Sequence, residues 1–320
     1  MNNKGQVLMI SLWVLIILAL LAVNLGHEVS LDLRVGRYHV DKLKAYALAK
    51  AGLNSAVVEL DNDKNDYDAL TERWSTGMEA GKPIFQKKEI RSGSGEDFTV
   101  GELSSDGTYE CIIDEERKIN INTASLGLLS AFLEDAGVAN ARSVANSIRA
   151  FRGATDISFS EQSSHPQGGQ GFKGQDFVNA EELILVDGMT EEAVKNLSLK
   201  ATVFGDGLIN INTVSAETLK IFLRGIARDI SVADNFADQL TDKVVKDRNT
   251  VGAYKSVRDI NVMVSTEEET NIFNRFVNRI VFKSNNFLIN VTGEAGVTKT
   301  RLAAIYEKKN KKIVFWHEEG

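Results

Sequence analysis

The chain has 320 residues, of which 43% are hydrophobic and 25% are charged, enough for one large or two smaller hydrophobic cores. Its 44 acidic and 37 basic side chains give a net charge of -7, which disfavours nonspecific attraction to nucleic acids or anionic lipids. Cys111 is the only cysteine, so an intramolecular disulfide is excluded. Packing and hydrogen bonds must therefore hold the fold together.

The first predicted element is a membrane helix. After a leader at 1–5, an apolar run from Val7 to Leu25 carries no charged side chain. About 20 residues of helix cross the roughly 30 Å hydrocarbon layer of a bilayer, so we expect residues 6–27 to span it. Lys4 precedes the run, and the positive-inside rule then predicts a cytoplasmic N-terminus and a periplasmic bulk. A plain anchor or an uncleaved signal is the alternative interpretation.

The helix is expected to continue well beyond the membrane. Helix-forming residues dominate to Leu60 and no proline occurs between Asn24 and Pro83, so one helix over 7–60, about 80 Å long, is predicted. Its second half is expected to be amphipathic and to cover a sheet. The predicted helical stripe consists of Val40, Leu43, Ala47 and Ala51. Small residues are expected to keep that face narrow and to allow close backbone approach, namely Ala45, Ala47, Ala49, Ala51 and Gly52.

Alternating apolar and polar residues predict strands on both sides of a long middle region. Strands at 98–103 and 108–113 are expected to form a hairpin through Asp106-Gly107, and three more strands follow at 286–292, 298–306 and 311–316. A long helix with an antiparallel sheet indicates an α+β fold with an insertion.

The middle region, 118–281, contains an internal repeat. Asn-Ile-Asn-Thr occurs at 120–123 and again 90 residues later at 210–213. In each copy a serine follows two residues on, at a position that predicts a helix N-cap. We interpret the motif as a helix start, with direct ligand binding as the alternative. The region is predicted to be a duplicated all-helical insertion of helix-hairpin-helix or SAM-like type.

These features together predict five segments along the chain. They are the leader at 1–5, the membrane half of the helix at 6–27, the stalk helix and first strands at 28–117, the helical insertion at 118–281, and the closing strands at 282–320.

The combination resembles the general secretion pathway protein K family, the large minor pseudopilins of the bacterial type II secretion system. The resemblance is carried over nearly the whole chain by the Lys4-Gly5 leader, the apolar helix with Trp13, the Ala/Gly-rich stretch at 45–53, the two Asn-Ile-Asn-Thr motifs and the three-strand end. It implies a pilin-like fold in which the long helix packs on the sheet. It also implies a protein, not an enzyme, that caps and helps to initiate the periplasmic pseudopilus for export across the outer membrane.

The same resemblance implies partners and processing. I- and J-type minor pseudopilins would be the partners, together with other pseudopilus subunits. A prepilin peptidase would cleave after Gly5 and methylate Gln6, leaving the protein in the bacterial inner membrane. Pilin-type subunits generally carry a glutamate at the fifth mature position, which here is Ile10. Because a buried carboxylate needs a partner, its absence favours a place at the end of a filament.

A calcium site is the one candidate for a bound cofactor. Asp61, Asp63, Asn65 and Glu72 stand at relative positions 1, 3, 5 and 12, the spacing of oxygen ligands in an EF-hand loop. Position 6 is Asp66 where an EF-hand has glycine, and a solvated helix-ending turn is the alternative. The resemblance implies calcium in the helical domain instead, although residues 154–174 offer few carboxylates for it.

The rival functional class is a membrane-anchored periplasmic DNA-binding protein, because both repeats are distantly similar to the helix-hairpin-helix module of competence proteins. Residues 118–281 hold 17 basic and 21 acidic side chains, whereas phosphate binding needs a positive patch, so no nucleic acid is expected. The four histidines are scattered and the chain has no phosphate loop or nucleophile elbow, which argues against an enzyme.

Overall fold

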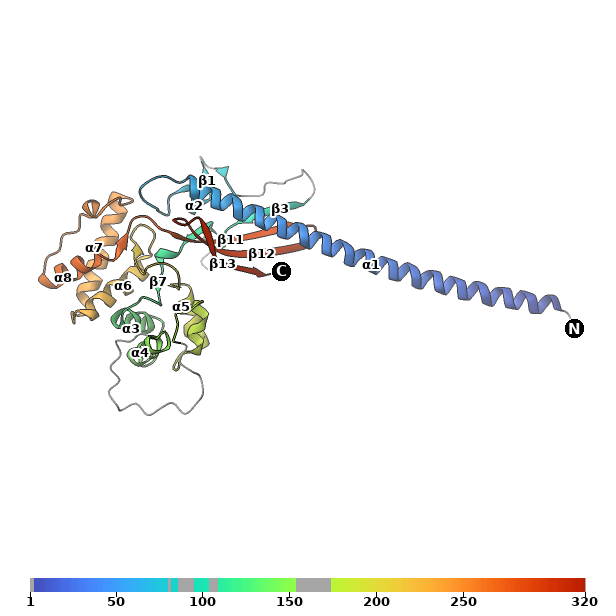
Figure 1. The fold of residues 1–320 in the computed structure, drawn as a ribbon, viewed down its shortest axis with the longest axis horizontal. Helices are drawn as coiled ribbons and strands as arrows, with labels where there is room; N and C mark the ends of the chain where they lie inside the picture. Colours follow the sequence, from blue (N-terminus) through green and yellow to red (C-terminus); the bar gives the residue numbers. More distant parts are fainter. Residues whose placement is uncertain (1–2, 80–81, 86–94, 104–108, 154–173, 320) are drawn as a thin grey trace.

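A single helix of 60 residues dominates the computed structural model, which describes residues 3–79, 82–85, 95–103, 109–153 and 174–319. This helix, α1 (Asn3–Asn62), projects far from the rest of the chain with its first half and lies on a sheet with its second half (Figure 1). A group of helices lies at the opposite end of the sheet from the N-terminus. The predicted long helix is confirmed, and it passes Gly26 without a break.

The sheet joins strands from both sides of the helical insertion. Its strands are β3 (Glu96–Val100), β6 (Ile112–Asp114), β11 (Asn286–Ala295), β12 (Thr298–Glu307) and β13 (Lys312–Glu319). All pairings are antiparallel, in the order β13-β12-β11-β3, and β6 pairs with the other end of β11. The three closing strands agree with those predicted. The long strand β11 therefore ties the chain before the insertion to the chain after it.

The predicted hairpin is present but shorter than expected. Its arms are β4 (Glu102–Leu103) and β5 (Tyr109–Glu110), which pair antiparallel, and the turn with Asp106-Gly107 falls outside the described residues. Gly101 interrupts the first strand with φ 96°, and a Cβ there would lie 2.4 Å from the Glu110 carbonyl oxygen. Because the chain bends at this glycine, β3 and β6 pair with β11 and not with each other.

Small elements connect α1 to the sheet. They are α2 (Arg73–Thr76), β1 (Met78–Glu79) and β2 (Lys82–Pro83). The 3-10 helix η1 (Glu115–Arg117) lies between β6 and the first strand of the helical domain.

The buried face of α1 differs from the predicted stripe. Val40 and Leu43 are 51% and 70% exposed. The buried face consists of Ala45, Leu48, Ala49, Gly52, Leu53, Ala56 and Leu60. The reason is close backbone approach, because a Cβ on Gly293 of β11 would lie 2.0 Å from the Ala45 carbonyl oxygen. Only the face with the smallest side chains fits against β11 at that distance.

The helical domain consists of two copies of one unit. The first copy runs through β7 (Ile119–Asn120), α3 (Leu126–Asp135), α4 (Ala141–Phe151), η2 (Ala180–Leu185), α5 (Glu191–Ser198) and β8 (Ala201–Thr202). The second runs through β9 (Ile209–Asn210), α6 (Ala216–Asp229), α7 (Asp234–Val251), η3 (Val257–Asp259), α8 (Glu267–Phe276) and β10 (Ile280–Val281). In each copy the first short strand pairs in parallel with the last, so the domain contains two strand pairs that the sequence did not predict.

The two copies share one hydrophobic core, in which α3 packs against α6. A second, separate core lies between α1 and the sheet and includes Trp74, Phe287 and Leu302. The helical domain contacts the sheet through the rings of Phe204 and Phe315, 6.0 Å apart, and through buried polar contacts near the end of α1.

Candidate functional site

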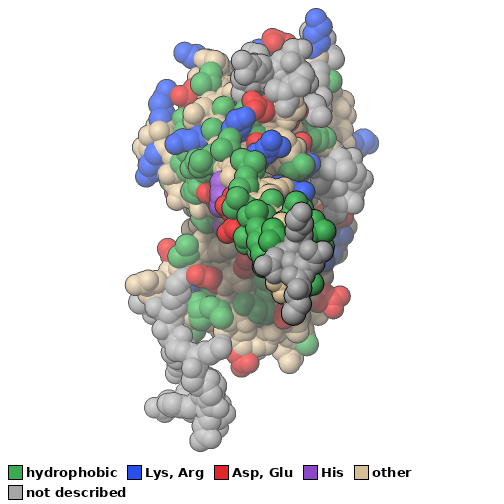
Figure 2. Space-filling model, turned by 90° about the vertical axis from the view of Figure 1, so that its right-hand side faces the viewer, with side chains coloured by type: hydrophobic (Ala, Val, Ile, Leu, Met, Phe, Trp, Pro, Cys, Tyr) green, Lys and Arg blue, Asp and Glu red, His purple; other side chains and the backbone are tan. Residues whose placement is uncertain are grey.

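The first half of α1, which does not pack on the sheet, carries most of the exposed large hydrophobic side chains of the described chain. Gly5 and Gln6 lie in its first exposed turns, and Ile10 is 64% exposed. Figure 2 looks at the molecule from the N-terminal side and shows hydrophobic side chains of this helix reaching toward the viewer. The helix is long and apolar enough to cross a membrane, and none of its apolar window is buried against the rest of the chain. It is therefore consistent with a single-pass anchor.

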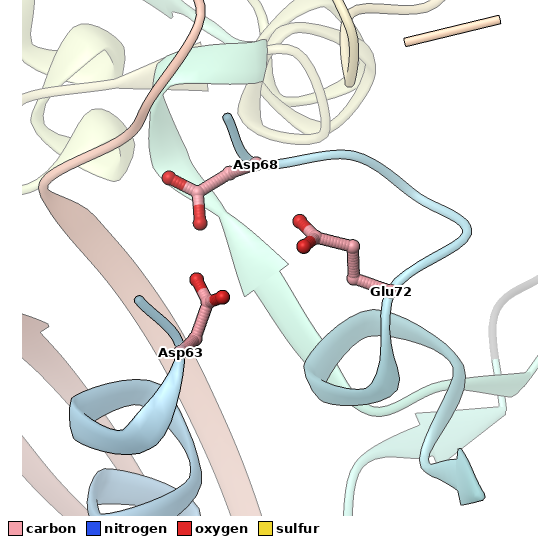
Figure 3. A group of neighbouring side chains, drawn as sticks. All are labelled: Asp63, Asp68 and Glu72. Carbon is pink, nitrogen blue, oxygen red and sulfur yellow. The ribbon is translucent and has the colours of Figure 1, made fainter. Parts of the chain in front are cut away.

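A cluster of carboxylates lies just beyond the end of α1. One oxygen each from Asp63, Asp68 and Glu72 lies within 4.8 Å of the others, and the three side chains face one another in Figure 3. Asp63 follows the last residue of α1, and Glu72 precedes α2. Asp68 is held between them because its backbone N–H donates to the Phe282 carbonyl at 2.7 Å. We call this group the acidic cluster.

Each member of the acidic cluster has at least one protein partner. Asp63 Oδ2 accepts a hydrogen bond from Lys308 Nζ at 2.9 Å. Asp68 Oδ2 accepts from the Ser284 N–H at 2.6 Å, and burial raises the pKa of Asp68 to about 7. Glu72 Oε2 accepts from Trp74 Nε1 at 3.1 Å. The cluster is thus both partly buried and partly neutralised by lysine.

The structure brings together some of the residues in the predicted EF-hand spacing and separates others. Asp63 and Glu72 meet, and the Asn65 amide donates to Glu72. Asp61 points elsewhere, since its carboxylate accepts from Tyr306 Oη at 2.7 Å and from Lys311 Nζ at 3.1 Å.

The acidic cluster also contains Asp68, which the sequence analysis did not include. Asp68 stands at position 8 of the loop, where the EF-hand pattern expects no ligand, so the spacing gave no signal for it.

A second buried polar group lies next to the acidic cluster and joins the two domains. Asp114, at the end of β6, is almost fully buried. Its Oδ2 accepts from Thr213 Oγ1 at 2.6 Å, Ser284 Oγ at 2.7 Å and Asn210 Nδ2 at 3.1 Å. Burial raises the pKa of Asp114, while these hydrogen bonds oppose the rise. The carboxyl group therefore links the sheet to the second repeat and to the start of the closing strands.

Glu116 extends this junction. Its carboxylate accepts from the backbone N–H of Asn286 at 3.1 Å and from the Asn286 side chain at 2.9 Å. Burial, and then the neighbouring Asp114 charge, raise the pKa of Glu116 to about 8. Neither acid was predicted from the sequence, because a run of acids such as 114–116 is typical of an exposed turn.

The repeated asparagines form structural hydrogen bonds. The Asn122 side chain donates to the Phe177 carbonyl at 2.9 Å and accepts from the Phe177 N–H at 2.8 Å. Asn212 makes the same pair of bonds with Tyr254, both at 2.8 Å. In both copies the amide replaces a backbone partner, which agrees with the interpretation of the motif as a structural one.

Two further contacts recur in both copies. Arg152 donates to the Ile121 and Ala124 carbonyls, and Arg248 donates to the equivalent Ile211 and Val214 carbonyls. Helices α3 and α6 begin with the serine caps predicted for them, in which Ser125 Oγ accepts from the Leu128 N–H and Ser215 Oγ from the Thr218 N–H. The duplication seen in the sequence is therefore also a duplication of hydrogen bonds.

Several basic side chains of the helical domain are engaged by acids. Arg224 pairs with Asp238 at 2.6 Å, and Lys243 pairs with Glu269 at 2.6 Å. Arg228 contacts both Glu134 and Asp234. Basic groups held this way are poorly placed to collect phosphates.

Cys111 lies buried between β5 and β6. Burial raises the pKa of its thiol to about 11, which keeps the thiol protonated near neutral pH and unreactive as a nucleophile.

Comparisons with known proteins support the fold. No protein-family model and no curated protein matches the sequence. Among solved structures, the chain is similar to a chain of the crystal structure of the GspK–GspI–GspJ complex from the type II secretion system of enterotoxigenic Escherichia coli. The TM-score is 0.61 at 14% sequence identity, and the match covers 90% of this chain and 99% of that one. The long helix, antiparallel sheet and inserted helices thus form a pilin-like α+β fold that is also found in that secretion complex.

Proposed function

We propose that this protein is a minor pseudopilin of a type II secretion system, and that it caps the pseudopilus and helps to initiate it. The observation that carries the proposal is the separation of two surfaces. The exposed apolar half of α1 lies at one end of the molecule, and the helical domain lies at the other (Figure 1). One end is suited to a membrane and to a helix bundle, while the other is a folded polar head.

The first half of α1 would anchor and dock the protein. Its apolar side chains would be buried by lipid before assembly and by the equivalent helices of other subunits afterwards. Lys4 ahead of the apolar run supports an inner-membrane protein with a cytoplasmic N-terminus and a periplasmic bulk. Prepilin peptidase would remove residues 1–5 and methylate Gln6, so that the mature chain begins with the apolar half of α1.

The position at the tip rests on shape and charge. The helical domain extends past the packed end of α1, into the space that a subunit stacked above would need (Figure 1). Ile10 replaces the carboxylate that would pair with a neighbouring amino terminus. Both features suit a subunit that ends the filament, with I- and J-type minor pseudopilins as its immediate partners.

Co-purification and secretion together test this function. The full chain, tagged at its C-terminus, would be expressed with I- and J-type pseudopilins and the peptidase, and the complex recovered from detergent-solubilised membranes. We expect a ternary complex whose K-type chain begins at Gln6 by mass spectrometry. We also expect the chain to restore export in cells that lack their own K-type subunit.

Two matched variants sharpen this test. Gly5→Lys should block cleavage and export, because the peptidase site needs a small residue, whereas Gly26→Ala, which adds a methyl group in open space on the same helix, should do neither. Absence of the complex and of export with the parent chain would contradict the proposal. Salt-sensitive binding to duplex DNA would favour the anchored DNA-binding alternative.

A further inference from the structure

The acidic cluster has a charge arrangement that the proposed function does not use. Asp63, Asp68 and Glu72 bring three carboxyl groups within 4.8 Å of one another. Like charges at such distances repel strongly in a partly buried site unless a cation lies among them. Lys308 supplies one positive charge, and its hydrogen bond goes to Asp63. One ammonium group does not balance three carboxylates.

Two buried oxygens that receive no hydrogen bond provide an independent observation. Asp68 is 0% exposed, and no described residue donates a hydrogen bond to its Oδ1 atom. Lys308 Nζ forms a long ion pair of 3.5 Å with that atom but no hydrogen bond. The Oδ1 atom of Asn65, whose amide touches Glu72, is also buried and receives no hydrogen bond from the described chain. Buried oxygens without donors are costly, and a bound cation would satisfy them.

We infer that the acidic cluster is a divalent cation site and that Ca²⁺ is the ion that fits it best. All candidate ligands are oxygens, and the described cluster offers no imidazole or thiolate, which disfavours zinc. Three carboxylates, the side-chain Oδ1 of Asn65 and water molecules would supply the six to eight oxygen ligands that Ca²⁺ takes. The site lies at the end of α1, outside the helical domain.

Binding would stabilise the junction between the two domains. The backbone of Asp68 donates to the Phe282 carbonyl at 2.7 Å and accepts from Asn210 Nδ2 at 3.2 Å, while its side chain accepts from Ser284. An ion that fixes Asp68 therefore also fixes the end of α1 against both the sheet and the second repeat. Lys308 competes for the same oxygens, so it lowers the affinity for the cation.

The position of Trp74 provides a direct probe. Its Nε1 atom lies 3.1 Å from Glu72 Oε2, so Tb³⁺ bound in the cluster would receive energy from this indole. The full chain in detergent micelles would be stripped with chelator and titrated with Tb³⁺ under tryptophan-selective excitation. We expect sensitised emission that Ca²⁺ displaces. We also expect Ca²⁺ to raise the melting temperature by about 2–4 °C or more.

Variants assign the signal to these residues. Trp74→Phe should abolish the sensitised emission but keep the Ca²⁺-induced thermal shift, because Trp13 and Trp316 lie on the membrane helix and on β13. Glu72→Gln, which can still accept from the Trp74 indole, should weaken Ca²⁺ binding on the order of tenfold. Lys308→Gln should strengthen it, because the competing ammonium is removed.

Asp61→Asn is the matched control, since Asp61 lies in the same segment but bonds Tyr306 and Lys311. It should leave binding unchanged. The site is refuted if neither the parent nor Lys308→Gln responds to Tb³⁺ or Ca²⁺, or if the response persists unchanged in Glu72→Gln. None of these measurements depends on the role in secretion, so either proposal can fail alone.

Discussion

The two copies of the Asn-Ile-Asn-Thr motif hold the same kind of backbone segment through their second asparagine, whereas the Nδ2 atom of their first asparagine donates to different partners. Asn122 and Asn212 each hold a backbone segment of their own repeat. Asn120 bonds the Phe204 and Gly205 carbonyls within the helical domain. Asn210 instead reaches the Asp68 carbonyl, Asp114 and Ser284, all outside its repeat.

This difference separates two roles for one sequence motif. The second asparagine belongs to the fold of the unit, so it makes the same bonds in both copies. The first asparagine lies at the edge of the unit, and its partners depend on what is packed there. In the second copy that neighbour is the end of α1 and the sheet, so the repeat also holds the two domains together.

The largest expected effect tests whether the first asparagine of the second copy holds the two domains together. Asn210→Ala removes a fully buried amide and leaves Asp114 without one of its donors, so we expect a loss of about 3 kcal/mol in the free energy of unfolding. Asn120→Ala should cost about 2 kcal/mol, because the Nδ2 atom of Asn120 donates to neutral carbonyls only, while the bond from its Oδ1 to the N–H two residues on is lost in both variants alike. Urea unfolding followed by circular dichroism measures both values.

Asn122→Ala and Asn212→Ala serve as the paired control for that experiment. Each removes one amide that bonds both backbone polar groups of one residue, and Asn122 adds only a long 3.4 Å bond to the Val203 carbonyl, so their costs should agree within about 0.5 kcal/mol. Equal losses in Asn120→Ala and Asn210→Ala would show that the junction contacts contribute nothing extra.

The stability of the junction should depend on pH through Glu116. The pKa of Glu116 is raised to about 8 by burial, so the folded state holds its proton more tightly than the unfolded chain does. The stability contributed by this group is fully present below the usual glutamate pKa near 4.5 and is lost as the pH rises to about 8. In the parent, the urea concentration at the unfolding midpoint should therefore fall as the pH rises, and Glu116→Gln should make that fall smaller.

Glu217→Gln, an exposed change on α6, is the control for the pH experiment and should leave the decline intact. A decline in Glu116→Gln as steep as in the parent would mean that other groups set the pH dependence.

The smallest expected effect concerns the caps that both copies share. Ser125→Ala and Ser215→Ala each remove one side-chain bond to a helix N-terminus, so each should cost about 1 kcal/mol in unfolding free energy. Thermal unfolding of both variants measures this. Because the caps lie within their own repeats, a much larger loss in only one copy would contradict the picture of two equivalent units.

The sequence predicted the features that depend on local patterns. The long helix follows from an apolar run and from helix-forming residues without proline, and the closing strands follow from alternation. The repeat was visible because the same residues recur at a fixed distance. On the face of α1 that covers the sheet, the close approach expected at Ala45, Ala49 and Gly52 is confirmed. Val40 and Leu43 were placed on that face wrongly, because both side chains are exposed.

Partnerships between distant segments were decided only by the tertiary structure. The sequence established an apolar N-terminal helix, an α+β order of elements and a duplicated insertion, since each depends on neighbouring residues or on repetition. It did not indicate that Asp68 would join Asp63 and Glu72, or that Asp114 would be buried between Asn210 and Ser284. Burial and charge at these sites arise from distant segments that packing brings together, and the spacing of residues along the chain does not predict which segments will meet.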